Sequence, residues 1–176
     1  TTSIAQHMGV TQGALFKHFP TKEAILEAVM DWVAEHLLSR VDEAAHAAQA
    51  HGGALAALEA IFLAHVDFVV EHPGVPRMLF GELQRSEMTA PKRVVQTLLG
   101  HYGARLQQWL AQGQAQGQVA GTLDCATAVT LFIGSLQGLV VQSMLAGDVL
   151  HMRRQAAPVF ALYRRAVMAV PAGDAP

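Results

Sequence analysis

The chain has 176 residues, 52% of them hydrophobic, and carries 12 Lys and Arg against 14 Asp and Glu. This length is enough for one domain with a sizeable core, and the single cysteine, Cys125, excludes an internal disulfide. The formal net charge of −2 argues by itself against a nucleic-acid-binding protein, because contacts to phosphates need Lys and Arg.

Residues 1–27 have the residue order of a helix, a tight turn, a second helix and the start of a third. Gly9 can end the first helix in a left-handed conformation, and Thr11 is a good N-cap for the second. Leu15 and Phe19, four residues apart, turn one face of the second helix inward. The other face is left with small and hydrogen-bonding residues and fits a DNA major groove. An ordinary corner between two helices is the alternative.

The rest of the chain predicts helices and no strands, because apolar residues recur at helical spacing. We expect breaks at Gly52-Gly53 and at Pro73-Gly74, and N-caps at Thr21 and Asp124. The fold class is therefore all-α. The expected helices span residues 21–50, 54–72, 75–86, 90–116, 125–146 and 148–170.

The amino-terminal segment resembles the DNA-binding signature of the tetracycline-repressor-like (TetR) family of bacterial transcriptional regulators. The matching residues are Ile4-Ala5, Gly9-Val10, Thr11, Gly13-Ala14-Leu15-Phe16-Lys17-His18-Phe19 and Thr21-Lys22-Glu23. The resemblance is dense but is confined to this segment. TetR-like proteins usually have one more helix before it, so we expect that the chain is incomplete at its amino terminus. A second departure is Phe16, which stands where the family often has tyrosine and cannot donate a hydroxyl to phosphate.

The resemblance implies a helix-turn-helix part followed by a TetR-like helical domain for ligand binding and dimerisation. Residues 1–22 would form the partial helix-turn-helix domain and 23–50 the connecting helix. Residues 51–171 would bind the effector and dimerise, and 172–176 would be a frayed tail.

The implied DNA-binding residues lie in the first 22 positions, where Gln12, Gly13 and Lys17 would face base edges. The charge here is thin, because residues 1–72 carry three Lys and Arg against nine Asp and Glu. The full DNA-binding set is Thr1, Thr2, Thr11, Gln12, Gly13, Phe16, Lys17, His18 and Lys22.

The central helices predict an effector pocket with an apolar wall and a few polar groups, as is typical of small-molecule sites. His65, Tyr102 and Gln137 would be costly to bury without partners. Each residue taken singly could instead be ordinary core. The candidate lining is Phe62, His65, Val69, Met78, Leu83, Leu99, Tyr102, Leu106, Phe132 and Gln137, and the expected ligand is a small hydrophobic or aromatic molecule.

Residues 125–147 contain no charged residue across 23 positions, which is long enough to span a bilayer. Two glutamines within the stretch, and no basic cluster or aromatic belt beside it, favour a buried helix of a soluble protein. In TetR-like proteins the last two long helices form the dimer interface. The candidate interface residues are Gly134, Gly138, Phe160 and Tyr163, and we expect a homodimer with no membrane partner.

Catalysis is the competing class, since the chain has nine histidines. None of them stands at metal-ligand spacing, and no nucleophile elbow or phosphate-binding glycine loop is present in the sequence. We therefore expect no enzyme activity, no metal and no cofactor. The expected function is a cytoplasmic, ligand-responsive regulator, most simply a repressor released from a palindromic operator on double-stranded DNA by a small effector. The alternative is a helical protein–protein interaction module that does not bind DNA.

Overall fold

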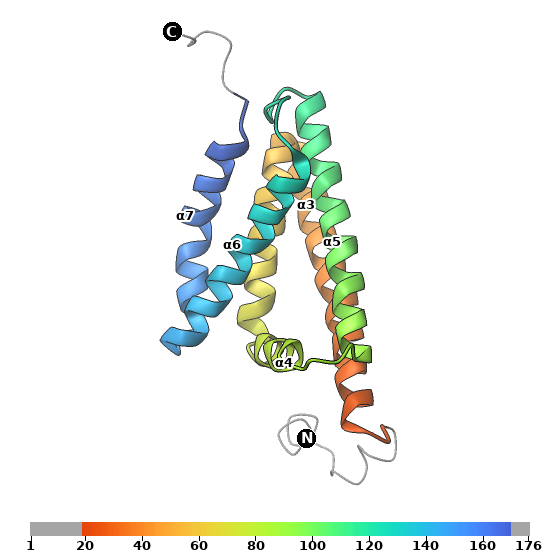
Figure 1. Ribbon diagram of the computed structural model, residues 1–176. Helices are drawn as coiled ribbons and strands as arrows, with labels where there is room; N and C mark the ends of the chain where they lie inside the picture. The colour runs from red at the N-terminus through yellow and green to blue at the C-terminus, as the bar shows by residue number, and fades with distance from the viewer. Residues whose placement is uncertain (1–18, 170–176) are drawn as a thin grey trace.

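The computed structural model describes residues 19–169 (Figure 1). Over these residues the backbone forms helices and no strand, apart from an isolated bridge between Val119 and Met168. This confirms the all-α prediction. The helices are α3 (Lys22–Glu71), α4 (Gly74–Leu83), α5 (Ala90–Ala115), α6 (Cys125–Ala146) and α7 (Leu150–Val167).

Helix α3 is a hairpin of two arms rather than a straight rod. Gly53 has φ 68° and ψ −153°, a conformation that side chains disfavour, and the chain reverses direction there. The amino-terminal arm (residues 22–52) and the carboxy-terminal arm (residues 54–71) lie antiparallel in Figure 1, and Arg40 on one binds Glu71 on the other, with Nη2 to Oε1 at 2.8 Å. The predicted break at Gly52-Gly53 is confirmed.

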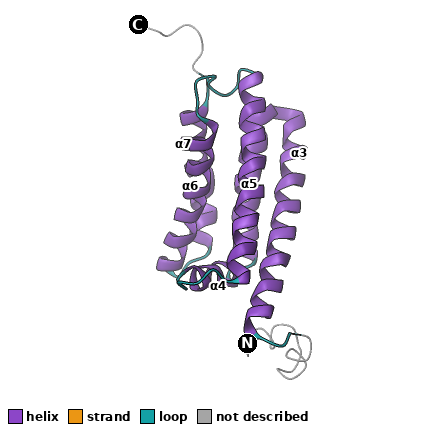
Figure 2. Ribbon diagram, turned by 45° about the vertical axis from the view of Figure 1, so that its right-hand side comes forward, coloured by secondary structure: helices purple, strands orange, loops and turns teal. Residues whose placement is uncertain are grey.

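The long helices run roughly parallel, and α4 lies across the end of the bundle near the start of α3 (Figures 1 and 2). Helix α5 packs chiefly against α3, and the Arg105 Nε donates to both carboxylate oxygens of Asp42 at 2.9 Å. Helices α6 and α7 pack on each other, and α7 also packs on α3. One hydrophobic core therefore joins α3, α5, α6 and α7.

Four aromatic rings form the centre of this core. Phe132 of α6 meets Phe62 of α3 edge-on, with ring centroids 5.2 Å apart, and meets Tyr163 of α7 edge-on at 5.3 Å. Phe160 of α7 lies beside both Phe62 and Tyr163. All four side chains are almost completely buried, so they hold three helices together.

Polar side chains cap the amino-terminal ends of α3 and α6 at the residues that the sequence predicts. The Thr21 hydroxyl accepts the backbone N–H of Ala24 at 3.0 Å, and the Asp124 carboxylate accepts that of Thr127 at 3.1 Å. Thr89 caps α5, and Pro91 occupies its first turn, where no N–H is needed.

Two helices, α3 and α6, are long and apolar enough to cross a membrane by length and composition alone. Half of the most apolar 18-residue stretch of α3 is buried inside the protein, whereas only a third of the corresponding stretch of α6 is buried. The buried side of α6 lies against the core, and its outer side exposes Leu131, Val141 and Leu145. The apolar character of α6 is thus divided between the core and an uncovered face.

Candidate ligand-binding cavity

An apolar cavity of about 160 Å³ lies between α3, α4, α5 and α6. Both arms of α3 contribute to its wall, and α4 closes the end of the bundle beneath it. Leu83 and Leu99 are half exposed at its edge, between α4 and α5. An aliphatic or aromatic surface is the complement of such a lining, because burial of apolar area drives binding.

Six of the ten predicted pocket residues line this cavity, from four different helices. They are His65, Val69, Leu83, Leu99, Tyr102 and Gln137.

The other four predicted residues do not line it, and that expectation is corrected here. Phe62, Leu106 and Phe132 are fully buried in the core, where neighbouring side chains already occupy the space beside them. Met78 faces the opposite side of α4 and borders a separate surface hollow together with Lys22.

Sequence reasoning missed most of the wall that comes from the amino-terminal arm of α3 and from α4. Val33 and Leu37 belong to an apolar stripe that is visible in the sequence, but the stripe alone does not reveal that it faces a void. The additional lining residues are Met30, Val33, Leu37, Phe68, Val75, Pro76, Leu79, Phe80, Val95, Leu98, Ile133, Leu136 and Val140.

A histidine–tyrosine pair is the main polar feature of the wall. His65 Nδ1 and the Tyr102 hydroxyl are hydrogen-bond partners at 3.0 Å, and the rings meet edge-on with centroids 5.4 Å apart. Burial lowers the pKa of His65 to about 4 and raises the pKa of Tyr102. Both groups are therefore neutral at pH 7 and satisfy each other, which leaves the cavity uncharged.

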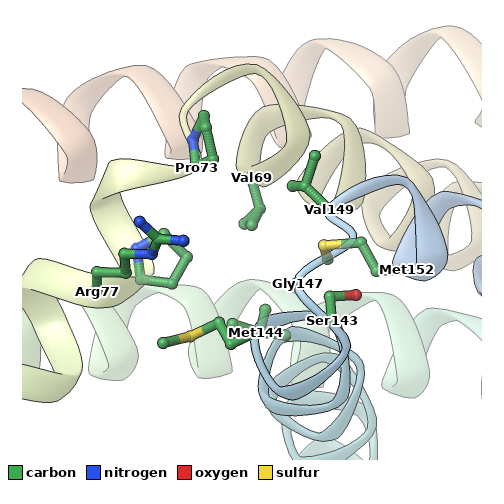
Figure 3. A pocket seen from close by; sticks show the side chains of 10 residues that line it. Val69, Pro73, Arg77, Ser143, Met144, Gly147, Val149 and Met152 are labelled. Atoms are coloured by element: carbon green, nitrogen blue, oxygen red, sulfur yellow. The ribbon is translucent and has the colours of Figure 1, made fainter.

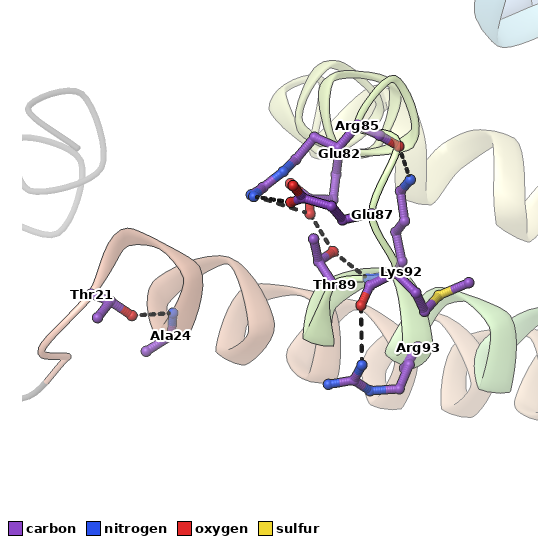
Figure 4. A network of polar contacts seen from close by, with 9 residues as sticks. Thr21, Ala24, Glu82, Arg85, Glu87, Thr89, Lys92 and Arg93 are labelled. Carbon is purple, nitrogen blue, oxygen red and sulfur yellow. Dashed lines mark hydrogen bonds and ion pairs between the residues drawn. The ribbon is translucent and has the colours of Figure 1, made fainter.

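A polar network fixes α4 to the start of α5 (Figure 4). The Thr89 hydroxyl donates to the buried Glu82 carboxylate and accepts the backbone N–H of Lys92 at 3.4 Å. Arg85 Nη1 lies 3.7 Å from Glu82 Oε1. The backbone carbonyl oxygen of Arg85 accepts a hydrogen bond from the Lys92 ammonium group. Helix α4, which closes the cavity at the end of the bundle, is thus attached to α5 by several polar contacts rather than by packing alone.

The predicted dimer residues fall on two different faces. Gly134 is exposed and Gly138 is partly exposed on the outer side of α6, with open space where each Cβ would lie. Phe160 and Tyr163 are buried within the chain's own core, which corrects the prediction that a second copy contacts them. The apolar stripe of α7 faces inward because Phe62 and Phe132 already pack against it.

Of the predicted DNA-binding residues, the structure describes Lys22 alone. Its side chain is exposed at the first position of α3. The others, Thr1, Thr2, Thr11, Gln12, Gly13, Phe16, Lys17 and His18, lie outside the described residues. Across residues 19–169 no group of three or more His, Cys, Asp or Glu side chains is placed to hold a metal ion.

The fold and cavity define an α-helical bundle protein with an apolar cavity between α3, α4, α5 and α6. Residues 1–29 match the model of the family "Bacterial regulatory proteins, tetR family". The match is limited to these residues, and the chain shares the fold of solved structures described as tetR-family regulators.

Two solved structures share this fold. FadR from Bacillus subtilis, crystallised with stearoyl-CoA, aligns with a TM-score of 0.75 at 18% identity over 94% of this chain and 87% of its own. The ketosteroid regulator KstR2 of Mycobacterium tuberculosis aligns with a TM-score of 0.76 at 17% identity over 96% of this chain and 84% of its own. Among curated relatives, the nucleoid occlusion factor SlmA of Marinomonas sp. (strain MWYL1) is 21% identical over 80% of this chain and 70% of its own.

Proposed function

We propose that the protein is a ligand-responsive transcriptional regulator, a cytoplasmic repressor released from a palindromic operator by a small apolar or aromatic effector. The observation that carries this proposal is the cavity wall. Met30, Val33 and Leu37 of the amino-terminal arm of α3 line the cavity, and the same arm begins at Lys22, the last residue of the proposed DNA-binding segment. A ligand that displaces this wall also displaces the helix that continues from the proposed DNA-binding segment.

In this division of labour, residues 1–22 read DNA, 23–50 connect, and 51–171 bind the effector and dimerise. Gln12, Gly13 and Lys17 face base edges, and the remaining proposed contacts lie near phosphates. FadR's bound stearoyl-CoA is a property of that protein. It supports an effector with an apolar part for this chain, whose cavity wall is also apolar.

We propose a homodimer that pairs through the outer faces of α6 and α7. Exposed apolar side chains gather on these two helices: Leu131, Val141, Leu145, Leu150 and Leu162. The exposed Gly134 lies among them on α6 and would allow a second helix to approach closely. Two readers held a helical turn apart match a palindromic site, so the binding energies of two short helices combine. No catalytic role and no cofactor is assigned to the cavity.

A gel shift of the full-length protein on the DNA upstream of its own gene tests this function. Binding that a cavity ligand reverses supports the regulator, and absence of any specific shift supports a protein–protein interaction module instead. Two substitutions test the proposed DNA-binding segment. Lys17→Ala should relax the preference for one DNA sequence over others. Lys22→Ala should weaken binding to all DNA sequences and make the affinity less dependent on salt concentration. Wild-type discrimination by Lys17→Ala in a competition assay would remove the base-reading role of Lys17.

A further inference from the structure

A second hollow, of about 230 Å³, lies next to the apolar cavity, between α4, the end of α6 and the start of α7 (Figure 3). Val69, Pro76 and Val140 line both spaces, so these three side chains form the partition between them. Neither space alone reaches the range of roughly 300–1,000 Å³ that is usual for sites of drug-sized ligands, but the two together reach its lower end.

The second hollow differs from the first in its chemistry. The Ser143 hydroxyl is buried in its wall, with the side chain only 4% exposed, and it is the one buried side-chain polar atom of the described residues that has no hydrogen-bond partner. A buried hydroxyl without a partner costs free energy, so its persistence points to a partner supplied by something bound.

A guanidinium group lies on the other side of the same hollow. Arg77, on α4, lines it (Figure 3) and makes no hydrogen bond or ion pair within residues 19–169, unlike Arg85, which follows the end of that helix. Helix α4 begins at this point and α6 ends here, so their opposed dipole ends tend to cancel. Arg77 is therefore the net charge of the lining, and it favours an anion.

We propose that the effector is an amphiphile whose apolar chain fills the cavity beside Tyr102 and whose anionic head group lies in the second hollow. There Arg77 pairs with the head group, and the Ser143 hydroxyl donates a hydrogen bond to it. Movement of Val69, Pro76 and Val140 joins the two spaces. This assignment rests on the proposed effector role of the cavity and specifies its ligand class as an acid with a single aliphatic chain.

Isothermal titration of the full-length protein with decanoate and with 1-decanol, which has the same chain and no charge, tests the head-group site. Both probes should bind. Arg77→Gln should weaken decanoate binding roughly tenfold or more, as expected for a lost charge-assisted contact, and leave decanol binding unchanged. Arg165→Gln is the matched control, because Arg165 is an exposed arginine on α7 that does not line the hollow, and it should change neither affinity.

Ser143→Ala should weaken decanoate binding about threefold. It should not lower the melting temperature of the free protein, because the hydroxyl has no partner to lose. A lowered melting temperature would show that Ser143 is a structural residue and would overturn its assignment.

Equal decanoate affinity in Arg77→Gln and the wild type would remove the head-group site while leaving the apolar effector cavity in place. Parallel loss of both probes in Arg77→Gln would show a structural effect and would also overturn the site. Failure of the wild type to bind either probe would remove the amphiphile as ligand. None of these results depends on DNA binding, so they remain separate from the gel-shift test of the regulator.

Discussion

The side-chain oxygen of Gln118 accepts the backbone N–H of Ala54 at 2.8 Å, across 64 positions of sequence. The amide nitrogen of the same side chain donates to the carbonyl oxygen of Gly52 at 3.1 Å. One glutamine therefore satisfies backbone groups on both sides of the break in α3, and it serves as the N-cap of the carboxy-terminal arm although it lies in a different part of the chain.

Gln118→Ala should lower the free energy of unfolding by about 1–2 kcal/mol, because the Ala54 N–H loses its acceptor in a partly buried place. Urea denaturation followed by circular dichroism measures this. Gln116→Ala, two positions away and exposed, is the control and should change stability by less than about 0.5 kcal/mol. Equal stability of the two variants would contradict the capping role.

Phe132 is a fully buried ring of the core, whereas Met88 is a half-exposed side chain between α4 and α5. Phe132→Ala should cost about 3–5 kcal/mol of stability, because it removes the ring that Phe62 and Tyr163 pack against. Met88→Ala should cost less than about 1 kcal/mol in the same urea titration, since Met88 is half exposed and lies outside the proposed interface. If Phe132→Ala does not fold, Phe132→Leu provides the comparison and should still be the less stable of the two variants.

His65, in the cavity wall, makes the free energy of unfolding depend on pH. The pKa of His65 is about 4 in the folded protein and near 6.5 in the unfolded chain. At a pH between these two values His65 is therefore protonated in the unfolded state and neutral in the native state. The neutral histidine therefore imposes no penalty above about pH 6.5, and stability falls as the pH drops toward 4.

Between pH 7.5 and pH 5 this loss should be about 2 kcal/mol. His65→Gln should remove that part of the loss, as measured by urea denaturation at the two pH values. His101→Gln, an exposed histidine on α5, should leave the difference between the two pH values unchanged. A full wild-type pH dependence in His65→Gln would exclude His65 as its source.

The outer face of α6 should decide the oligomeric state. Leu145 is 84% exposed and Leu131 51% exposed, and the double variant Leu131→Glu/Leu145→Glu places charges in the proposed interface. Analytical ultracentrifugation at micromolar concentration should show a dimer for the wild type and a monomer for the double variant. Met88→Glu, at a similarly exposed position between α4 and α5, should remain dimeric. A dimeric double variant would place the interface elsewhere.

Helix order was predictable from local chemistry. Gly53 breaks α3 and Asp124 caps α6 because each acts on its own backbone neighbours, within reach of a sequence argument. The contents of the cavity were less predictable. Helical spacing separates inward from outward residues, but Phe62 and His65 are both inward. Only the packing of the other helices decides that rings of α6 and α7 pack against Phe62, whereas His65 contacts Tyr102 and also borders the cavity.

The dimer residues show the same limit. Phe160 and Tyr163 stand on an apolar stripe that suits an interface between chains as well as a core within one chain. The structure places them in the core, because Phe62 and Phe132 lie opposite. Gly134 and Leu145 could be assigned to the exposed face of α6 only once the buried side of that helix was known. A stripe indicates that a face must be covered, and the tertiary structure decides what covers it.

The hairpin form of α3 also has a mechanical consequence. Its amino-terminal arm is anchored at Gly53 and, at about 1.5 Å per residue, is roughly 45 Å long. A rotation of about 5° about the anchored end carries Leu37, in the cavity wall, through about 2 Å and Lys22 through about 4 Å. In the proposed regulator the arm acts as a lever of about twofold gain, in which a displacement of about 2 Å at Leu37 becomes one of about 4 Å at Lys22.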